Sequence, residues 1–124
     1  MATAKKILIV EDEESFLFAF KEKIQGEGFE VLEAKNGEKG LELALKEHPD
    51  LILLDILMPV MDGMTMLKKL REDEWGKKAQ VILLTNLSDN EKTAQALELN
   101  TFDYLVKSDW NIKDVVVKIR EKLK

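Results

Sequence analysis

Cysteine is absent from this 124-residue chain, and histidine occurs only once. Without cysteine there is no disulfide framework, no thiol nucleophile and no thiolate-ligated zinc site, so a reducing compartment suits the chain. Residues 1–6 lack the apolar stretch of a signal peptide, and no apolar run approaches the roughly 18 residues that a membrane span requires. We therefore expect a cytoplasmic protein that does not associate with a membrane.

Positive charge is in deficit, because 19 lysines and arginines stand against 24 aspartates and glutamates, which gives a net charge of −5. Non-specific binding to nucleic acid requires clustered positive charge, so this balance argues against direct contact with nucleic acid. A chain of this length can build one hydrophobic core but is too short for a second folded unit. We therefore expect a single domain over residues 1–124.

Short apolar runs alternate along the chain with amphipathic segments, a pattern typical of βα units in a parallel sheet with helices on both faces. The expected strands are residues 6–10, 29–34, 51–55, 80–84 and 103–106. The expected helices are residues 13–25, 36–48, 64–74, a segment that opens at 88–91, and 111–123. In the second helix, the apolar spacing predicts that Leu41, Ala44 and Leu45 are buried.

Acidic residues stand where two of these strands end. A continuous apolar run leads to Asp55, and Glu11 and Asp12 follow the first strand. A turn would explain Asp55 alone equally well, so the other strand ends must decide. Thr85 follows the fourth strand and Lys107 the fifth. Because the carboxyl ends of parallel strands share one edge of a sheet, where ligands bind, we expect these side chains to converge on one site.

The residue types at this edge suit phosphoryl transfer. Clustered carboxylates repel one another unless a cation or protons hold them together, and Mg²⁺ is the hard cation that prefers oxygen ligands and recruits phosphate oxygens. An ionised Asp55 is then able to act as a nucleophile toward phosphorus. Lys107 would offset charge on the transferred group and Thr85 would donate a hydrogen bond, which meets the needs of a reaction that depends mainly on positioning and electrostatics.

In order and spacing, these residues resemble the receiver domains of two-component response regulators over essentially the whole chain. The matching features are Glu11-Asp12, Asp55 with the loop through Gly63, Thr85, Tyr104 and Lys107. The resemblance implies a flavodoxin-like (βα)5 fold, a doubly wound parallel sheet with strand order 2-1-3-4-5. It also implies that Asp55 accepts a phosphoryl group from a histidine kinase or a small phosphodonor.

The same resemblance implies a set of magnesium ligands. Asp12 and Asp55 would bind Mg²⁺ directly, Glu11 would act partly through water, and the backbone carbonyl of Leu57 would complete the protein's share. Glu11 stands where the family more commonly has aspartate, so we expect binding to be retained with an altered geometry.

The resemblance also implies a switch. Thr85 and Tyr104 match the pair in which the hydroxyl moves to a phosphate oxygen and the ring fills the space that it leaves. A phosphoryl group adds about −1.5 to −2 of charge, which is sufficient to bias a loop between two packings. The surface bordering this pair, over about residues 90–123, would then bind an effector or a second copy of the chain.

Some residues depart from the family pattern. Lys107 is followed by Ser108 in place of the usual proline, and we expect a trans peptide because a cis bond before a non-proline residue costs about 2.5–4 kcal/mol. Asn86 replaces a smaller residue and would narrow access to Asp55. Leu57 and Leu87 are unable to orient a hydrolytic water, so we hypothesise a long-lived phosphoryl state.

Two rival functions use related features. An aspartyl-phosphate phosphatase would need a second aspartate two residues after Asp55, where this chain has Leu57. An interaction module that works without phosphorylation would be expected to lack one of the acids, the threonine or the lysine, and none is missing. We therefore interpret the chain as a phosphoacceptor signalling domain and not as an enzyme acting on other molecules, with the phosphorylation-independent module as the alternative.

Overall fold

The computed structural model describes residues 4–56, 58–85, 103–106 and 112–123, with the backbone alone described at 85, 103–106 and 112. Five parallel strands form one sheet in the order β2-β1-β3-β4-β5, which confirms the predicted doubly wound, flavodoxin-like fold. In chain order the elements are β1 Lys6–Val10, α1 Glu14–Gly26, β2 Glu30–Ala34, α2 Gly37–Glu47, β3 Leu51–Asp55, α3 Gly63–Arg71, the 3₁₀ helix η1 Gly76–Lys78, β4 Val81–Thr85, β5 Asp103–Val106 and α5 Ile112–Lys122.

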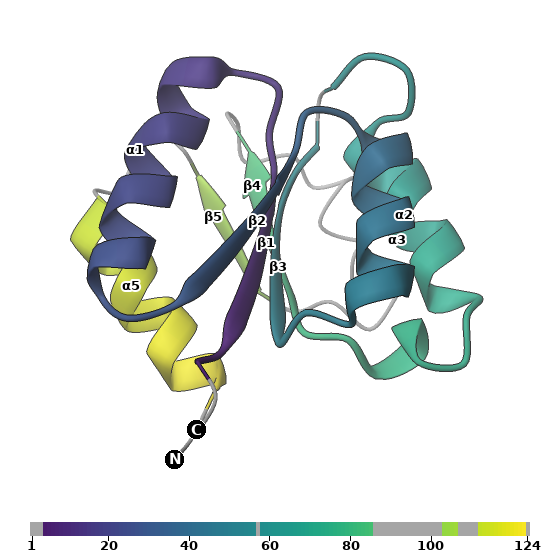
Figure 1. Cartoon of the computed structure of the whole chain (residues 1–124). Coiled ribbons are helices and arrows are strands. Elements are labelled where there is room, and N and C mark those ends of the chain that lie inside the picture. The colour runs from purple at the N-terminus through teal and green to yellow at the C-terminus, as the bar shows by residue number, and fades with distance from the viewer. Residues whose placement is uncertain (1–3, 57, 86–102, 107–111, 124) are drawn as a thin grey trace.

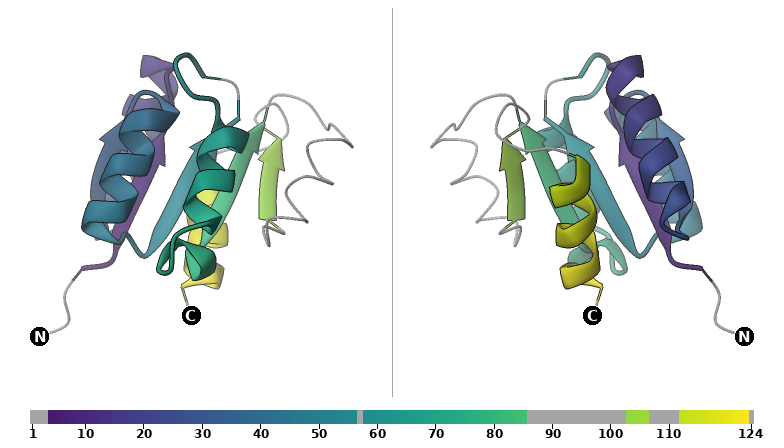
Figure 2. Two further views of the ribbon diagram at one scale, coloured as in Figure 1. Left: turned by 90° about the vertical axis from the view of Figure 1, so that its right-hand side faces the viewer. Right: turned by 90° about the vertical axis from the view of Figure 1, so that its left-hand side faces the viewer.

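Helices cover both faces of the sheet. α1 and α5 lie on one face, and α2 and α3 lie on the other (Figure 1). The two side views in Figure 2 place each pair of helices in front of the sheet in turn. Along β3, Leu51 and Leu53 pack toward α1 and α5, whereas Ile52 and Leu54 pack toward α2 and α3. This two-sided burial explains why the central strands are apolar at consecutive positions instead of alternating.

Side chains cap the start of two helices. The side chain of Asn36 accepts a hydrogen bond of 2.9 Å from the Lys39 backbone N–H at the start of α2. Asp62 accepts one of 2.8 Å from the Thr65 N–H at the start of α3. Each bond satisfies a donor that has no partner within the first turn of the helix.

Two local predictions were wrong. The third helix ends at Arg71 and not near residue 74, and the chain then turns into η1. Leu45 has 37% of its surface exposed, although Ala44 is fully buried. The fully buried residues of α2 are small (Gly37, Gly40 and Ala44), and Leu41 and Leu43 pack partly against the core, which leaves Leu45 turned outward. The fourth predicted helix lies outside the described residues.

Candidate functional site

Three acidic side chains meet at the carboxyl edge of the sheet. Glu11 and Asp12 directly follow β1, and Asp55 is the last residue of β3. These strands are parallel neighbours in a register that pairs Val10 with Leu54, so the chain positions that follow lie side by side. One carboxylate oxygen from each acid lies within 4.8 Å of the others. The structure thus brings together three of the acids that the sequence assigns to one site.

The three acids differ in their exposure to solvent. Glu11 is completely buried and Asp55 has 4% of its surface exposed, whereas Asp12 is exposed. Buried carboxylates of like charge disfavour one another's ionised form, and a hard divalent cation with oxygen ligands removes that penalty. The donor set of three converging carboxylate oxygens fits Mg²⁺, with the exposed Asp12 on the solvent side of the cluster.

Glu11 also connects the site to the start of α1. Its backbone N–H donates to the Ala34 carbonyl at 3.0 Å, which extends the pairing of β1 and β2 by one residue. Its side-chain Oε1 accepts a hydrogen bond of 3.1 Å from the N–H of Glu13, the residue that precedes the first turn of α1. The Glu11 carboxylate therefore contributes both to the acidic cluster and to the geometry of the turn that leads into α1.

Backbone hydrogen bonds fix the segment after Asp55. The N–H of Ile56 donates to the Leu84 carbonyl of β4 at 3.2 Å, and the Ile56 carbonyl accepts from the Gly63 N–H at 2.8 Å. The Met61 carbonyl accepts a 2.9 Å hydrogen bond from the N–H of Gly37, the first residue of α2. Sequence reasoning assigned no role to Gly37, because no hydrophobic spacing indicates this backbone contact.

The remaining predicted site residues are described in part. Thr85 ends β4, which pairs with β3 so that Leu84 lies opposite Asp55, and its backbone is at the same edge as the acids. The backbone of Tyr104 pairs with Leu83 in β4. Leu57 and Lys107 lie outside the described residues.

Other predictions also fall outside the described residues. They concern the Lys107–Ser108 peptide, Asn86, Leu87 and most of the surface over residues 90–123. Within that surface the structure describes β5 and α5.

The chain matches the response regulator receiver domain family over residues 7–120. It belongs to this family. The matched range spans the three acids, Thr85 and Lys107, and the match confirms the resemblance to this family. The family is a signalling module of two-component systems. Among the described residues, no helix has both the length and the apolar character needed to traverse a bilayer.

Comparisons with named relatives and solved structures support this family assignment. The response regulator PleD of Caulobacter vibrioides is 36% identical over 115 residues, which cover 93% of this chain and 25% of PleD. The chemotaxis protein CheY4 of Vibrio cholerae has a TM-score of 0.90 at 28% identity, with 98% of this chain and 100% of CheY4 covered. A CheY-like receiver domain protein from Methanospirillum hungatei has a TM-score of 0.90 at 31% identity, with 98% and 94% covered. The chain spans about half or less of the length of the curated relatives it matches: 25% of PleD and 48% of a probable transcriptional regulator, ycf27, of Porphyridium aerugineum.

Proposed function

We propose that this receiver domain is a phosphoacceptor in which Asp55 receives a phosphoryl group with Mg²⁺ held by Glu11, Asp12 and Asp55. The observation that supports this most directly is the convergence of three carboxylate oxygens within 4.8 Å at the carboxyl edge of the sheet. Two of these acids are buried beside one another, and a divalent cation would offset the repulsion between their charges. In a receiver domain, such a cluster would bind the Mg²⁺ that phosphoryl transfer to Asp55 requires.

The chemistry asks little of the protein beyond positioning. An oxygen of the ionised Asp55 carboxylate forms a bond to phosphorus while the bond from phosphorus to the donor breaks, at the histidine nitrogen of a kinase or the acyl oxygen of a small phosphodonor. No proton needs to leave Asp55, because its attacking form is the carboxylate. Bound Mg²⁺ would neutralise charge shared by the acids and the transferred group.

The resemblance supplies the rest of this proposal. The Leu57 carbonyl would be the further magnesium ligand, and Thr85 and Lys107 would contact the transferred phosphoryl group. Thr85 and Tyr104 would then pass the change to the surface over residues 90–123, where an effector or a second copy of the chain binds. The donor in the cell would be a histidine kinase.

Intact mass spectrometry tests the proposal. The unaltered chain is incubated with acetyl phosphate and Mg²⁺, beside Asp55→Asn and a matched control, Asp50→Asn, which changes an aspartate at the opposite end of the same strand. We expect the unaltered chain and Asp50→Asn to gain one phosphoryl group and Asp55→Asn to gain none. Equal labelling of Asp55→Asn would overturn the assignment of the acceptor.

Two extensions of the experiment address the alternatives. If neither acetyl phosphate nor a phosphorylated histidine kinase labels the unaltered chain, the phosphorylation-independent interaction module becomes the better interpretation. Once the phosphodonor has been removed, the decay of the phosphorylated mass tests the expectation of a long-lived state. Loss of the phosphoryl group within seconds, in the absence of a phosphatase, would contradict it.

A further inference from the structure

The loop after Asp55 contains a strained residue. Val60 has a φ of 68°, in the left-handed region that a β-branched residue rarely adopts, and 76% of its surface is exposed. The N–H of Met61 donates to the Pro59 carbonyl at 2.8 Å, which closes a three-residue turn around Val60. A γ-turn whose central residue has a positive φ is uncommon and strained, and it persists only where the surroundings impose it.

Glycines hold this loop on both sides. At its tip, the Gly37 N–H donates to the Met61 carbonyl, and a Cβ added to Gly37 would overlap the Met61 carbonyl oxygen. At its base, the Gly63 N–H donates to the Ile56 carbonyl, and a Cβ on Gly63 would overlap the carbonyl oxygen of Asp55. Both glycines are buried, and their backbones approach the loop directly with no side chain between.

We propose that Gly37 is a positioning residue for the Asp55 site, acting through the loop over residues 58–62. The Gly37 N–H donates to the Met61 carbonyl, and the absence of a Cβ lets this carbonyl lie against the start of α2. Val60 adopts the strained conformation that this contact requires. This inference rests on the proposed function, because it concerns how the metal and phosphoryl site is kept in shape.

A second glycine in α2 shows that this role is local. A Cβ on Gly40 would press on Val10 Cγ2 at 2.8 Å and on Met66 Sδ at 3.0 Å, both side chains of buried core residues. Gly40 therefore serves core packing, one turn along the helix from the residue that contacts the loop. Gly26, the last residue of α1, has open space where a Cβ would lie. The chain thus offers three glycines in helices with three different surroundings.

The test compares Gly37→Ala with Gly40→Ala and Gly26→Ala. For each protein we would measure the midpoint of urea unfolding, the affinity for Mg²⁺ alone by titration calorimetry, and the rate of labelling by acetyl phosphate. We expect Gly37→Ala to weaken Mg²⁺ binding by about tenfold or more, as do other changes to groups that orient a metal ligand set. Gly40→Ala should lose stability but keep its Mg²⁺ affinity. Gly26→Ala should also keep its Mg²⁺ affinity, with an unfolding midpoint that is unchanged or slightly higher.

A second pair of variants guards against simple misfolding of Gly37→Ala. Val60→Gly removes the strain, and in Gly37→Ala/Val60→Gly the loop is free to move away from the added methyl group. We expect the double variant to regain the unfolding midpoint of Val60→Gly but to keep the weakened Mg²⁺ affinity, because the contact with the Met61 carbonyl is still lost. Wild-type Mg²⁺ affinity in the double variant would overturn the positioning role.

Measurements on the unaltered chain distinguish failure of the proposed function from failure of the role of Gly37. If it neither binds Mg²⁺ nor gains a phosphoryl group, the proposed function fails and the inference fails with it. If it does both, and Gly37→Ala binds Mg²⁺ as well as Gly40→Ala does, the proposed function stands and Gly37 is a packing residue only.

Discussion

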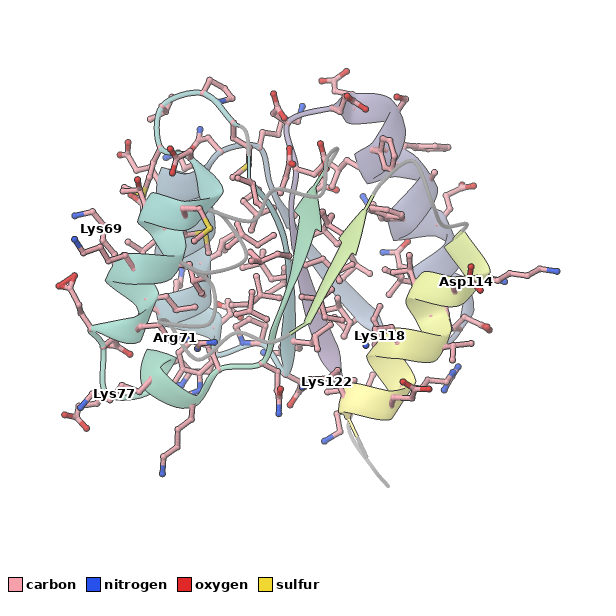
Figure 3. The ribbon with its side chains drawn as sticks, turned by 180° about the vertical axis from the view of Figure 1, so that it is seen from behind. Lys69, Arg71, Lys77, Asp114, Lys118 and Lys122 are labelled. Atoms are coloured by element: carbon pink, nitrogen blue, oxygen red, sulfur yellow. The ribbon has the colours of Figure 1, made fainter. Side chains whose placement is uncertain are left out.

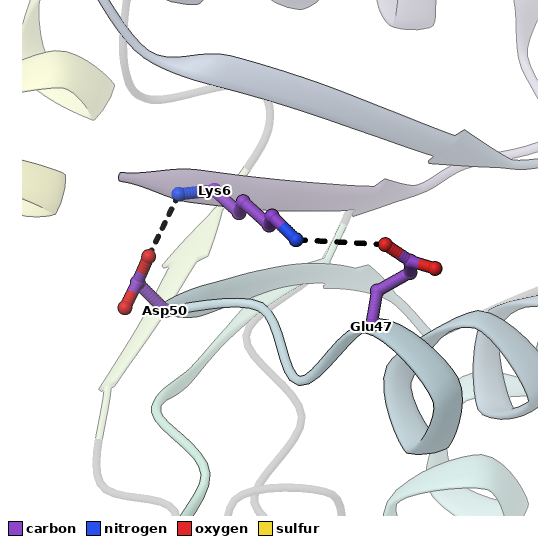
Figure 4. Close-up of polar contacts among 3 residues, drawn as sticks. All are labelled: Lys6, Glu47 and Asp50. Carbon is purple, nitrogen blue, oxygen red and sulfur yellow. Dashed lines mark hydrogen bonds and ion pairs between the residues drawn. The ribbon is translucent and has the colours of Figure 1, made fainter. Parts of the chain in front are cut away.

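Like charges gather at the carboxyl ends of strands β1 and β3, whereas opposite charges pair at their amino ends. At the carboxyl end, Glu11, Asp12 and Asp55 place three like charges together. At the amino end, the Lys6 backbone N–H donates to Asp50 Oδ2 at 2.8 Å (Figure 4). The Asp50 N–H donates in turn to the Lys6 carbonyl at 2.8 Å. The Lys6 ammonium group also pairs with Glu47 Oε1 at 3.5 Å. Here opposite charges join the strands to the end of α2.

A second polar contact strengthens the amino end. Arg71, the last residue of α3, donates from Nη1 to the carbonyls of Gly76 and Ala79 at 2.7 and 2.8 Å. Figure 3 shows Arg71 directed inward beside η1, whereas Lys69 and Lys77 extend outward. Burial lowers the pKa of the Arg71 guanidinium, and the two carbonyls offset this loss of hydration. The amino edge of the sheet thus carries stabilising contacts, whereas the carboxyl edge carries a cluster of like charges, a division expected where function conflicts with stability.

The largest expected effect on stability is that of Mg²⁺ binding at the carboxyl end. At a concentration one hundred times its dissociation constant, a ligand that binds only the folded state raises the free energy of unfolding by about 2.7 kcal/mol. We expect this gain in urea unfolding of the unaltered chain and of Asp50→Asn, at matched ionic strength with Na⁺ as the control. Asp12→Asn should gain much less. Equal stabilisation of Asp12→Asn would mean that the ion binds somewhere other than the carboxyl end.

Removing the Arg71 guanidinium should weaken the amino end by nearly as much. Arg71→Met keeps most of the apolar stem but leaves two carbonyls without a charged donor, and we expect it to lower the free energy of unfolding by about 2 kcal/mol. Arg71→Lys should lose less than Arg71→Met, because its ammonium group keeps a charged donor, although it lacks the planar fork that serves both carbonyls. Urea unfolding measures both losses. Mg²⁺ affinity should not change, and a parallel loss of affinity would show that the two ends are coupled.

The same substitution at the two ends of β3 should have opposite signs. Asp55→Asn removes one of three neighbouring negative charges, and we expect it to raise the metal-free free energy of unfolding by about 1 kcal/mol. Asp50→Asn replaces a charge-assisted hydrogen bond to Lys6 with a neutral one, and we expect a loss of about 0.5 kcal/mol. Unfolding in the presence of a chelator measures both. A loss of stability in Asp55→Asn would show that the contacts of Asp55 outweigh its repulsion by the other acids.

The sequence predicts the fold well because the fold depends on repeated local patterns. The runs that end at Val10 and Asp55 are apolar at consecutive positions because both faces of the sheet are covered, and parallel topology then brings their ends together. The convergence of the acids on one edge was therefore predictable from the parallel direction of the strands. The carboxyl edge is specified by the same pattern that specifies the core.

Contacts that do not follow the period of a helix or strand were not predictable in this way. The end of α3 depends on bonds from Arg71 to the carbonyls of Gly76 and Ala79, which no helical period encodes. The role of Gly37 depends on a backbone approach to Met61 that leaves no trace in hydrophobic spacing. Leu45 was wrongly placed inside because helical spacing alone does not tell which face of α2 lies closest to the sheet.

The smallest predicted effect concerns an exposed ion pair at the carboxyl end. Glu14, the first residue of α1, and Lys35, which follows β2, are 2.8 Å apart, and both are exposed. The hydrogen bond and charge of Lys35 lower the pKa of Glu14, and those of Glu14 raise the pKa of Lys35. The pair therefore stabilises the fold above the ordinary pKa of glutamate and below that of lysine. This contribution is lost as the pH falls through the lowered pKa of Glu14 or rises through the raised pKa of Lys35.

This weak effect is tested by comparing the exposed Glu14–Lys35 pair with the Lys6–Glu47 pair at the amino end. We expect Glu14→Gln to lower the unfolding midpoint slightly near neutral pH, and the difference to vanish in acid below the lowered pKa of Glu14 and in high salt. Glu47→Gln breaks the pair with Lys6, whose side chains are 33% and 32% exposed, so its effect should be larger and should persist better in salt. If Glu14→Gln lowered the unfolding midpoint more than Glu47→Gln does, solvent screening would not explain the difference in strength between the two ion pairs.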